Sequence, residues 1–468
     1  MSRNKIQFGR PPKKQQKATA FSVKIDNLSL EGCGVAKHDG KTIFVEGAIP
    51  GETVVVKIDQ RHKNYDEASL ISIETLSQNR IDPNCEHFNH CGGCQLQHIA
   101  PLAQLEYKQQ AVLSLLLREA KIKPNKITDA LFSAPYHYRR TARIGVNKHR
   151  QTNTPIVGFR RKNSSKILQV SQCNILPKPL SSLFDKLREC LAKIDNAKAI
   201  THIEYLQGDT KGALTFRCME PLAPAAIALL NTLVNAFNLQ GFIRYDHSLV
   251  PLADNNGELS YAINNINLTF GSGNFLQVNA QINQQMIDRA IQWLALEADD
   301  QVLDLFSGLG NFSLPMAKHV CKVTALEGSE AMVTLACENA ALNSIENCEF
   351  HLADLTKDEP LRPFFEHHYT KVLLDPPRSG ATELIKNLLS SSANLSLQPH
   401  RILYVACDPL SLAKDAKLLK ELGYEMANFC VMDMFPNTVH IETMALFKKA
   451  ATPLKKVKAK KNKSLFAH

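Results

Sequence analysis

From about residue 300 onward, the sequence alternates short apolar runs with longer segments of helical spacing. The apolar runs are QVLDLF, KVTALE, CEFHLADL, KVLLDPP, RILYVACDP and IETMALF. Strands buried on both faces of a parallel sheet have such continuous apolar runs, because helices cover both sides. We therefore expect a doubly wound, Rossmann-like α/β domain, in which ligands bind beyond the carboxyl ends of the strands.

The chain has 468 residues, of which 44% are hydrophobic, so it is too long for a single core and is multidomain. Residues 19–76 alternate β-branched runs with glycine turns, which predicts a small β-barrel. Residues 77–100 and 125–268 mix strands and helices and predict a central α+β domain. The α/β domain then takes residues 101–124 and 269–447. Within 101–124, one face of a predicted helix carries Leu102, Leu105, Val112, Leu113 and Leu116.

The positive charge is concentrated at the two ends. Residues 1–18 carry six basic residues and residues 448–468 carry eight lysines, neither with an acid, whereas the net charge of the chain is +10. Basic arms suit a polyanion such as RNA, although a solubilising tail would have the same composition. The stretch YHYRRTARIGVNKHR can likewise stack on bases and grip phosphates, or can form a charged strand edge.

No apolar run reaches the roughly 20 residues of a membrane helix, and no early segment resembles a signal peptide. We expect a cytoplasmic protein without membrane contact, and a monomer, because nothing indicates an obligate protein partner. In a reducing compartment its twelve cysteines are free thiols, metal ligands or catalytic groups.

The segment VLDLFSGLGNFSLPMA predicts a strand, a tight glycine turn and a helix, a pattern that fits S-adenosylmethionine as well as NAD. Glu327 ends the next strand, where a carboxylate can accept both ribose hydroxyls. Asp354 ends the third strand, where it could accept from an adenine amino group. In LLDPPRSG, two prolines fix the backbone after Asp375 and predict a rigid, exposed carboxylate beside the cofactor. Such turns favour a methyltransferase that acts on nucleobases.

A cysteine and a glutamate suit methylation at C5 of a pyrimidine, which is a poor nucleophile. A thiolate that adds to C6 makes C5 nucleophilic, and a base must then remove the C5 proton before the thiolate leaves. Cys407, in ACDP at the end of the fifth strand, and Glu442, in NTVHIETMALF, meet these needs. The alternatives are a core cysteine and an exposed strand acid.

At these residues the sequence resembles the uracil-5-methyltransferases of RNA, most closely the bacterial 23S ribosomal RNA branch with a TRAM domain and an iron–sulfur cluster. The shared motifs are GSGNFLQVNAQ, DLFSGLGNFSLP, LEGS, LLDPPRSGA, YVACDP and DMFPNTVHIE. The resemblance implies Cys407 as the nucleophile, Glu442 as the base and Arg143 on the substrate side. The cofactor contacts it implies for S-adenosylmethionine are Gln277, Phe306, Asn311, Glu327, Asp354 and Asp375.

Cys85, Cys91 and Cys94 form a C-x5-C-x2-C pattern that predicts a metal site. Its fourth ligand is Cys173, or one of the histidines His87, His90 and His98, so zinc and a [4Fe-4S] cluster both remain possible from the residues alone. The family resemblance implies a [4Fe-4S] cluster on Cys85, Cys91, Cys94 and Cys173. The first gap differs from the C-x3-C-x2-C spacing of radical S-adenosylmethionine enzymes.

The sequence thus predicts methylation of uridine C5 in 23S ribosomal RNA, with S-adenosylmethionine as the donor and a covalent Cys407–C6 adduct. The alternatives are a transfer RNA uracil-5-methyltransferase and an RNA-binding assembly factor that keeps the fold without catalysis.

Overall fold

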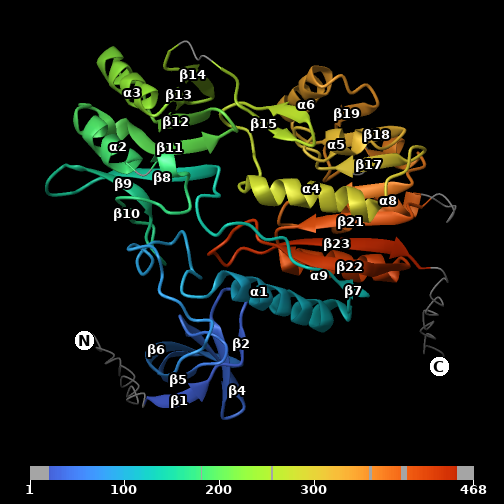
Figure 1. The fold of residues 1–468 in the computed structure, drawn as a ribbon, viewed down its shortest axis with the longest axis horizontal. Coiled ribbons are helices and arrows are strands. Elements are labelled where there is room, and N and C mark those ends of the chain that lie inside the picture. Colours follow the sequence, from blue (N-terminus) through green and yellow to red (C-terminus); the bar gives the residue numbers. More distant parts are fainter. Residues whose placement is uncertain (1–19, 181, 254–256, 358–360, 392–397, 451–468) are drawn as a thin grey trace, which may run out of the picture. The chain divides into compact units, whose positions relative to one another are not determined.

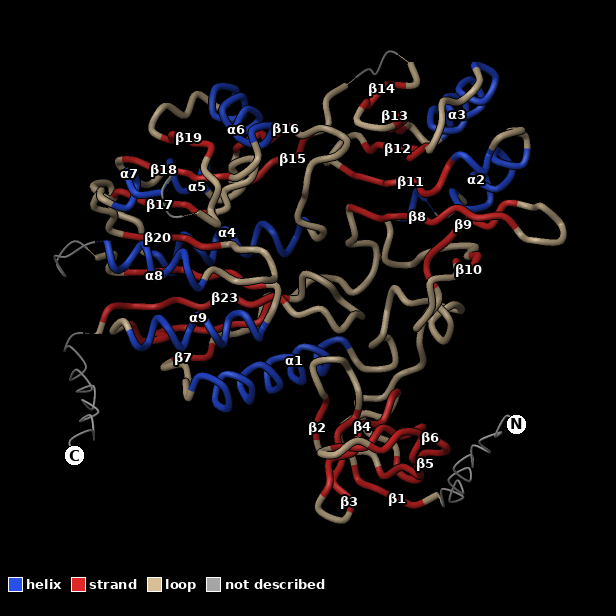
Figure 2. Tube along the Cα trace, turned by 180° about the vertical axis from the view of Figure 1, so that it is seen from behind, coloured by secondary structure: helices blue, strands red, loops and turns tan. Residues whose placement is uncertain are grey.

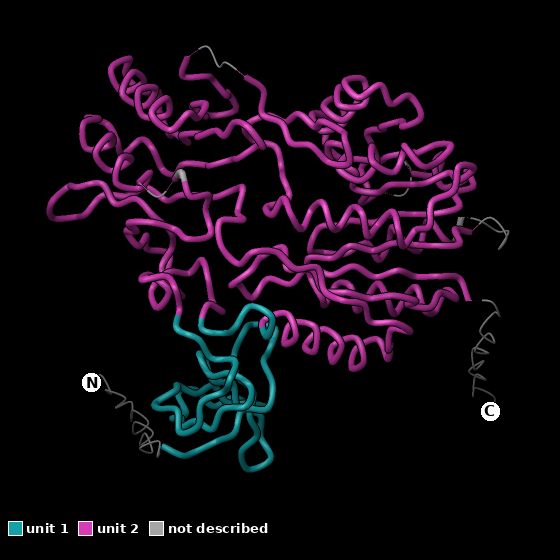
Figure 3. The backbone as a smooth tube through the Cα atoms, viewed as in Figure 1, with its two compact units in different colours: residues 1–82, 98–103 teal, residues 83–97, 104–468 magenta. Residues whose placement is uncertain are grey.

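The computed structural model describes residues 20–180, 182–253, 257–357, 361–391 and 398–450. The chain divides into two compact units, one of residues 1–82 and 98–103 and one of residues 83–97 and 104–468 (Figure 3). The predicted basic tails lie outside the described residues, apart from residues 448–450. Across the described residues, no helix combines the length and apolarity that a membrane span requires.

The first unit contains one six-stranded sheet in the order β1-β5-β6-β4-β3-β2. Its strands are β1 (Phe21–Lys24), β2 (Asn27–Leu28), β3 (Gly34–His38), β4 (Lys41–Glu46), β5 (Thr53–Arg61) and β6 (Tyr65–Thr75). β1 packs against β3, so the sheet curls around a core of alternating apolar residues such as Val23, Ile43 and Val54. This agrees with the small β-barrel predicted from the glycine-punctuated runs.

The second unit contains a seven-stranded sheet in the order β10-β9-β8-β11-β12-β13-β14. Its strands are β8 (Thr141–Lys148), β9 (Pro155–Arg160), β10 (Ile167–Gln169), β11 (Ile200–Gln207), β12 (Gly212–Cys218), β13 (Leu239–Tyr245) and β14 (Ser248–Pro251). The helices α2 (Leu183–Ala192) and α3 (Pro224–Ala236) pack on this sheet through Phe184, Leu187 and Leu230, which are fully buried. A central α+β arrangement follows from this packing.

The same unit contains an eight-stranded sheet in the order β19-β18-β17-β20-β21-β23-β22-β7. The strands predicted from the apolar runs are β17 (Gln301–Leu305), β18 (Lys322–Glu327), β19 (Cys348–Leu352), β20 (Lys371–Leu374), β21 (Arg401–Ala406) and β23 (Glu442–Lys449). The first five of these strands are parallel. In Figures 1 and 2, α4 (Ala280–Leu294) covers one face, and α8 (Thr382–Ser391) and α9 (Pro409–Glu421) cover the other.

One apolar run, IETMALF, does not form a parallel strand, because β23 is antiparallel to both β21 and β22 (Tyr424–Met432). The sheet also has two strands that the apolar runs did not predict, β22 and β7 (Lys126–Ile127). An apolar run gives burial but not direction, and a strand of two residues is too short to have a period.

Three predicted boundaries also differ from the structure. β7 pairs with β22, although its residues were assigned to the central domain. The hairpin of β15 (Ser260–Ile263) and β16 (Ile266–Thr269) packs in the core of the α/β domain. β23 continues to Lys449, two residues into the predicted tail.

The helix predicted within the segment APLAQLEYKQQAVLSLLLREAKI, residues 100–122, is present with slightly different bounds. α1 spans Pro101–Leu115, a wider helical turn continues to Ala120, and Lys121 then leaves the helix in a left-handed conformation. On its predicted apolar face, Leu105 and Val112 are buried, whereas Leu102 is 64% exposed. Leu102 lies in the first turn and therefore does not belong to the buried stripe.

Candidate active site and cysteine cavity

A cavity of about 490 Å³ lies at the carboxyl ends of β17 and β18. Of the six residues predicted to contact the cofactor, five line this cavity: Gln277, Phe306, Asn311, Glu327 and Asp375. The glycine turn shapes it, since Gly308 and Gly310 adopt φ values of 57° and 94° that glycine tolerates best. Phe306 also has a positive φ, 69°, so this non-glycine residue is held in an uncommon conformation at the cavity wall.

Hydrogen bonds fix the orientation of two side chains that line this cavity, Glu327 and Asn311. Glu327 accepts hydrogen bonds from the backbone N–H groups of Gly308 (3.0 Å) and Ser329 (2.9 Å). Asn311 exchanges amide hydrogen bonds with Asn283 on α4 and accepts from the Tyr261 hydroxyl at 2.9 Å. Tyr261 also lines the cavity, and its isolated position in the β15–β16 hairpin gave no sequence signal for this role.

Asp354 is the predicted cofactor residue that the structure does not place on this cavity. Its carboxylate accepts from the backbone and side chain of Thr356, at 3.0 and 2.6 Å, and pairs with Lys357 at 2.9 Å. The Thr356 hydroxyl and Lys357 lower the pKa of Asp354 to about 2. These local contacts satisfy the carboxylate within its own turn.

The antiparallel direction of β23 brings Cys407 and Glu442 together. Ala406, the last residue of β21, pairs with Thr443, so Cys407 follows β21 at the level where Glu442 begins β23. In an all-parallel sheet, the start of β23 would lie at the opposite edge, away from the cofactor cavity. The reversed strand is therefore what places the glutamate beside the cysteine.

The turn that carries Cys407 is built locally. Asp408 is the N-cap of α9 and accepts from the backbone N–H of Leu410 at 2.7 Å, and Pro409 occupies the first helical turn. The DPP turn is anchored to the same helix, because the buried Asp415 accepts from the backbone N–H of Ala381 (2.7 Å) and the hydroxyl of Tyr404 (2.6 Å). Asp415 was not predicted, since a single helical acid has no distinctive spacing.

Burial raises the proton affinity of Asp375, Glu442 and Cys407. It raises the pKa of Asp375 to about 7, so this side chain is less exposed than the sequence predicted. Burial and the neighbouring Asp375 also raise the pKa of Glu442, well above its usual range. Burial and the carboxylates of Glu442 and Asp375 raise the pKa of the Cys407 thiol to about 11, while Arg378 acts in the opposite direction. The edge combines a protonated thiol with a carboxyl group of high proton affinity.

A second cavity, of about 280 Å³, brings together the four predicted metal ligands Cys85, Cys91, Cys94 and Cys173. The cysteine loop is held against the β9–β10 turn, where Gly92 donates to the Arg160 carbonyl (2.9 Å) and Lys162 donates to that of His90 (2.9 Å). Of the histidines considered as alternative ligands, His87 lines the cavity, and His90 and His98 do not. The four cysteines of the predicted metal site therefore lie on one cavity, although Cys173 is far from the other three in sequence.

The wall of the cysteine cavity carries positive charge. Burial raises the pKa of Cys94 to about 12 and of Cys173 to about 11, and the other cysteines raise both further. Arg139 and Arg143 line the same cavity, so Arg143 lies beside the cysteines. Within the described ranges, no group of three or more His, Cys, Asp or Glu side chains is arranged to hold a metal ion.

The rest of the basic aromatic stretch faces a third cavity, of about 610 Å³, which is lined in part by Tyr136, His137 and Arg140. Arg140 is already paired with Asp209 at 2.6 Å and lies over the ring of Tyr261. Contact of this stretch with nucleic acid stays a prediction.

The sheet, the glycine turn and the cavity at its carboxyl edge define an S-adenosylmethionine-dependent methyltransferase fold. The structure is similar to that of the Pyrococcus abyssi tRNA (uracil-54, C5)-methyltransferase in complex with S-adenosyl-L-homocysteine. The TM-score is 0.69 with 22% sequence identity, covering 91% of this chain and 100% of that one. The model of the tRNA (uracil-5-)-methyltransferase family matches residues 101–450, and the chain belongs to this family. The TRAM domain model matches residues 14–71.

Relatives of similar length resemble the chain over most of its length. A protein of Shewanella halifaxensis, named 23S rRNA (uracil(1939)-C(5))-methyltransferase RlmD, is 36% identical over 441 residues, or 94% of this chain and 98% of the relative. A protein of the same name from Legionella pneumophila is 38% identical over 440 residues, covering 92% of this chain and 98% of the relative. The match therefore includes the barrel as well as the catalytic domain.

Proposed function

We propose that this protein methylates C5 of a uridine in 23S ribosomal RNA, with S-adenosylmethionine as the methyl donor. The observation that carries this proposal is the pairing of β21 with β23, which sets Cys407 and Glu442 side by side near Asp375, a residue of the cofactor cavity. Relatives named for this activity support the choice of RNA.

In the proposed reaction, the Cys407 thiol first loses its proton to solvent. The thiolate then adds to C6 of the uracil, and the electron pair displaced from the C5–C6 bond makes C5 nucleophilic. When bound, S-adenosylmethionine would supply an electrophilic methyl group, since its S–CH₃ bond can break as the C5–CH₃ bond forms and leave S-adenosylhomocysteine. Glu442 then removes the C5 proton, and the electrons of that C–H bond restore the double bond as the thiolate leaves. The high proton affinity of Glu442 suits this last step.

The target base must leave its stack to reach a partly buried thiol, so a single-stranded or flipped uridine is the expected substrate. Glu327 is proposed to hold the ribose hydroxyls of the cofactor, because its carboxylate is already oriented by two backbone N–H groups. Asp354 remains a proposed contact to the adenine, and it would first have to leave Lys357.

We also propose that Cys85, Cys91, Cys94 and Cys173 hold a [4Fe-4S] cluster. Four thiolates suit either zinc or a [4Fe-4S] cluster. The four thiols line one cavity of about 280 Å³, and the family resemblance, which implies the cluster, supports the choice. Anaerobically purified protein should be brown with about four irons per chain. Colourless protein with one zinc would contradict the proposal.

One experiment separates the candidate functions. Naked 23S ribosomal RNA and a mixture of transfer RNAs are each incubated with methyl-labelled S-adenosylmethionine, and the labelled base is mapped. We expect 5-methyluridine at one position of the 23S RNA and none in the transfer RNAs. Label in transfer RNA alone would favour the activity for which the Pyrococcus abyssi enzyme is named. No label in either RNA would favour a non-catalytic binding protein.

A further inference from the structure

Glu442 is preceded by a buried loop, residues 433–441, that joins β22 to β23. Asn437 lies in the middle of this loop, is 1% exposed, and has a φ of 66°. Asparagine is among the few residues that tolerate this left-handed conformation. The backbone therefore turns sharply five residues before the proposed base.

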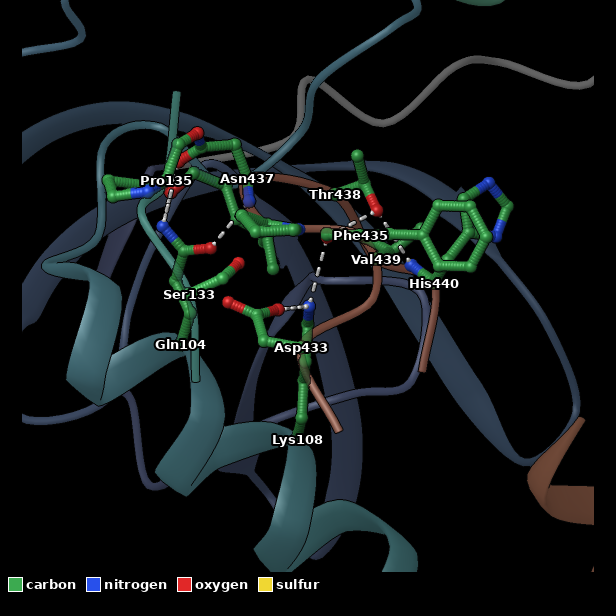
Figure 4. A network of polar contacts seen from close by, with 12 residues as sticks. Gln104, Lys108, Ser133, Pro135, Asp433, Phe435, Asn437, Thr438, Val439 and His440 are labelled. Atoms are coloured by element: carbon green, nitrogen blue, oxygen red, sulfur yellow. Dashed lines mark hydrogen bonds and ion pairs between the residues drawn. The ribbon is translucent and has the colours of Figure 1, made fainter. Parts of the chain in front are cut away.

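Asn437 makes hydrogen bonds to three separate segments of the chain (Figure 4). Its side-chain amide donates to the Pro135 carbonyl at 2.7 Å and accepts from the Gln104 side chain at 3.1 Å. Its backbone N–H donates to the Gln104 Oε1 atom at 2.9 Å. Its backbone carbonyl accepts from the N–H groups of Gln95 (2.9 Å) and Leu96 (3.0 Å), which directly follow Cys94.

The remaining contacts hold the two ends of the loop. At its start, Lys108 of α1 forms a buried ion pair with Asp433 at 3.1 Å and donates to the Phe435 carbonyl at 3.4 Å (Figure 4). After Asn437, the Thr438 hydroxyl accepts from the backbone N–H of His440 at 3.2 Å. The direction in which the chain enters β23 is thus fixed by α1, the cysteine loop and the segment around Pro135.

We propose that Asn437 is a positioning residue for the proton-removal step, which rests on the roles proposed above for Cys407 and Glu442. Cys407 is held by β21 and the N-cap of α9, neither of which contacts Asn437 through a hydrogen bond found in the described chain. Loss of the Asn437 contacts would therefore displace the glutamate and leave the cysteine in place. Addition of the thiolate and methyl transfer would continue, and elimination would slow.

The test is a single-turnover reaction of Asn437→Gly with labelled cofactor and 23S RNA, resolved on a denaturing gel. Glycine keeps the left-handed backbone and removes both side-chain hydrogen bonds. We expect a methyl-labelled, protein-linked RNA band to accumulate, and release of product to be about 10- to 100-fold slower than in the wild type, because small displacements of a reacting group have effects of this size. Asn265→Gly is the matched control, since Asn265 has a φ of 60° in an exposed hairpin turn.

Parallel loss of adduct and product in a folded Asn437→Gly protein would contradict the proposal, as would normal turnover. If that variant does not fold, Gln104→Met removes the side-chain hydrogen bond between Gln104 and Asn437 and the acceptor of the Asn437 backbone N–H, and it should give the same adduct. A different failure would concern the proposed function. If the wild type forms no adduct even with 5-fluorouridine at the target, then the roles of Cys407 and Glu442 are wrong, whatever Asn437 does.

Discussion

The two residues proposed to carry the chemistry are held in place by different means. Cys407 lies in a turn built from its own neighbours, namely the buried strand β21, the N-cap Asp408 and Pro409. Glu442 lies after a loop whose shape depends on residues about 300 positions away in sequence, including Lys108 and Gln104. A residue that is held by its sequence neighbours can be recognised from the sequence and depends on few other parts of the fold. A residue that is held by distant segments takes its position only when the whole unit has assembled correctly.

The largest expected effect is that of replacing Cys407, which is held by its sequence neighbours. Cys407→Ala should abolish methylation, a loss of at least about 10⁴-fold, because no other step can activate C5. It should also form no covalent complex with RNA that contains 5-fluorouracil at the target. Cys337→Ala, at an exposed cysteine, is the control and should keep both properties. A Cys407→Ala protein that still cross-links would break the assignment.

Glu442→Gln should give an equally slow enzyme that fails at a later step. The amide cannot take the C5 proton, so the thiolate cannot leave after the methyl group has been transferred. A methylated, protein-linked RNA should therefore accumulate on a denaturing gel, and only when cofactor is present. Normal turnover by this variant would show that another group is the base.

Loss of a contact to the 433–441 loop should lower the free energy of unfolding more than loss of a contact in the turn that carries Cys407. Lys108→Met leaves Asp433 buried without its ion-pair partner, which typically costs about 3–5 kcal/mol. Asp408→Ala removes the N-cap side chain, which accepts from the backbone N–H groups of Leu410 and Ser411, and such a loss typically costs about 1 kcal/mol. Thermal unfolding of the two variants should show the larger shift for Lys108→Met. Equal shifts would mean that Asp433 carries no charge once Lys108 is removed, and would contradict this prediction.

The smallest expected effect is a change in the alkylation rate of the Cys407 thiol. Because the pKa of Cys407 is raised to about 11, its alkylation by iodoacetamide should be slow at neutral pH and should rise with pH. Glu442→Gln removes a negative neighbour and should lower this pKa, so alkylation at pH 9 should be a few-fold faster than in the wild type. Peptide-resolved mass spectrometry measures the rate, with the exposed Cys321 as an internal reference. Slower alkylation in the variant would contradict the electrostatic coupling.

The same contrast explains what the sequence could and could not predict. The glycine turn, Glu327 and the DPP turn are short local patterns at strand ends, and the structure places their residues on one cavity. Asp354 also ends a strand, but its partners Thr356 and Lys357 were not part of any pattern. The direction of β23 could not be read from IETMALF, because burial on both faces looks the same in either direction. No sequence pattern indicated a positioning role for Asn437, because its five hydrogen bonds are made with residues far away in sequence.

The position of β23 between β21 and β22 also has a consequence for how the protein is made. During synthesis the earlier parts of a chain emerge and begin to fold first. β23 is the last strand of the described chain, and until it emerges, β21 and β22 each keep an unpaired edge at the centre of the future sheet. Such edges invite pairing with other chains. A ribosome-bound chain that ends before Glu442 would hold a completed nucleophile turn, an open sheet and no base. The proposed base and the strand that closes the sheet would therefore be synthesised at the same stage, because both belong to the eight residues of β23.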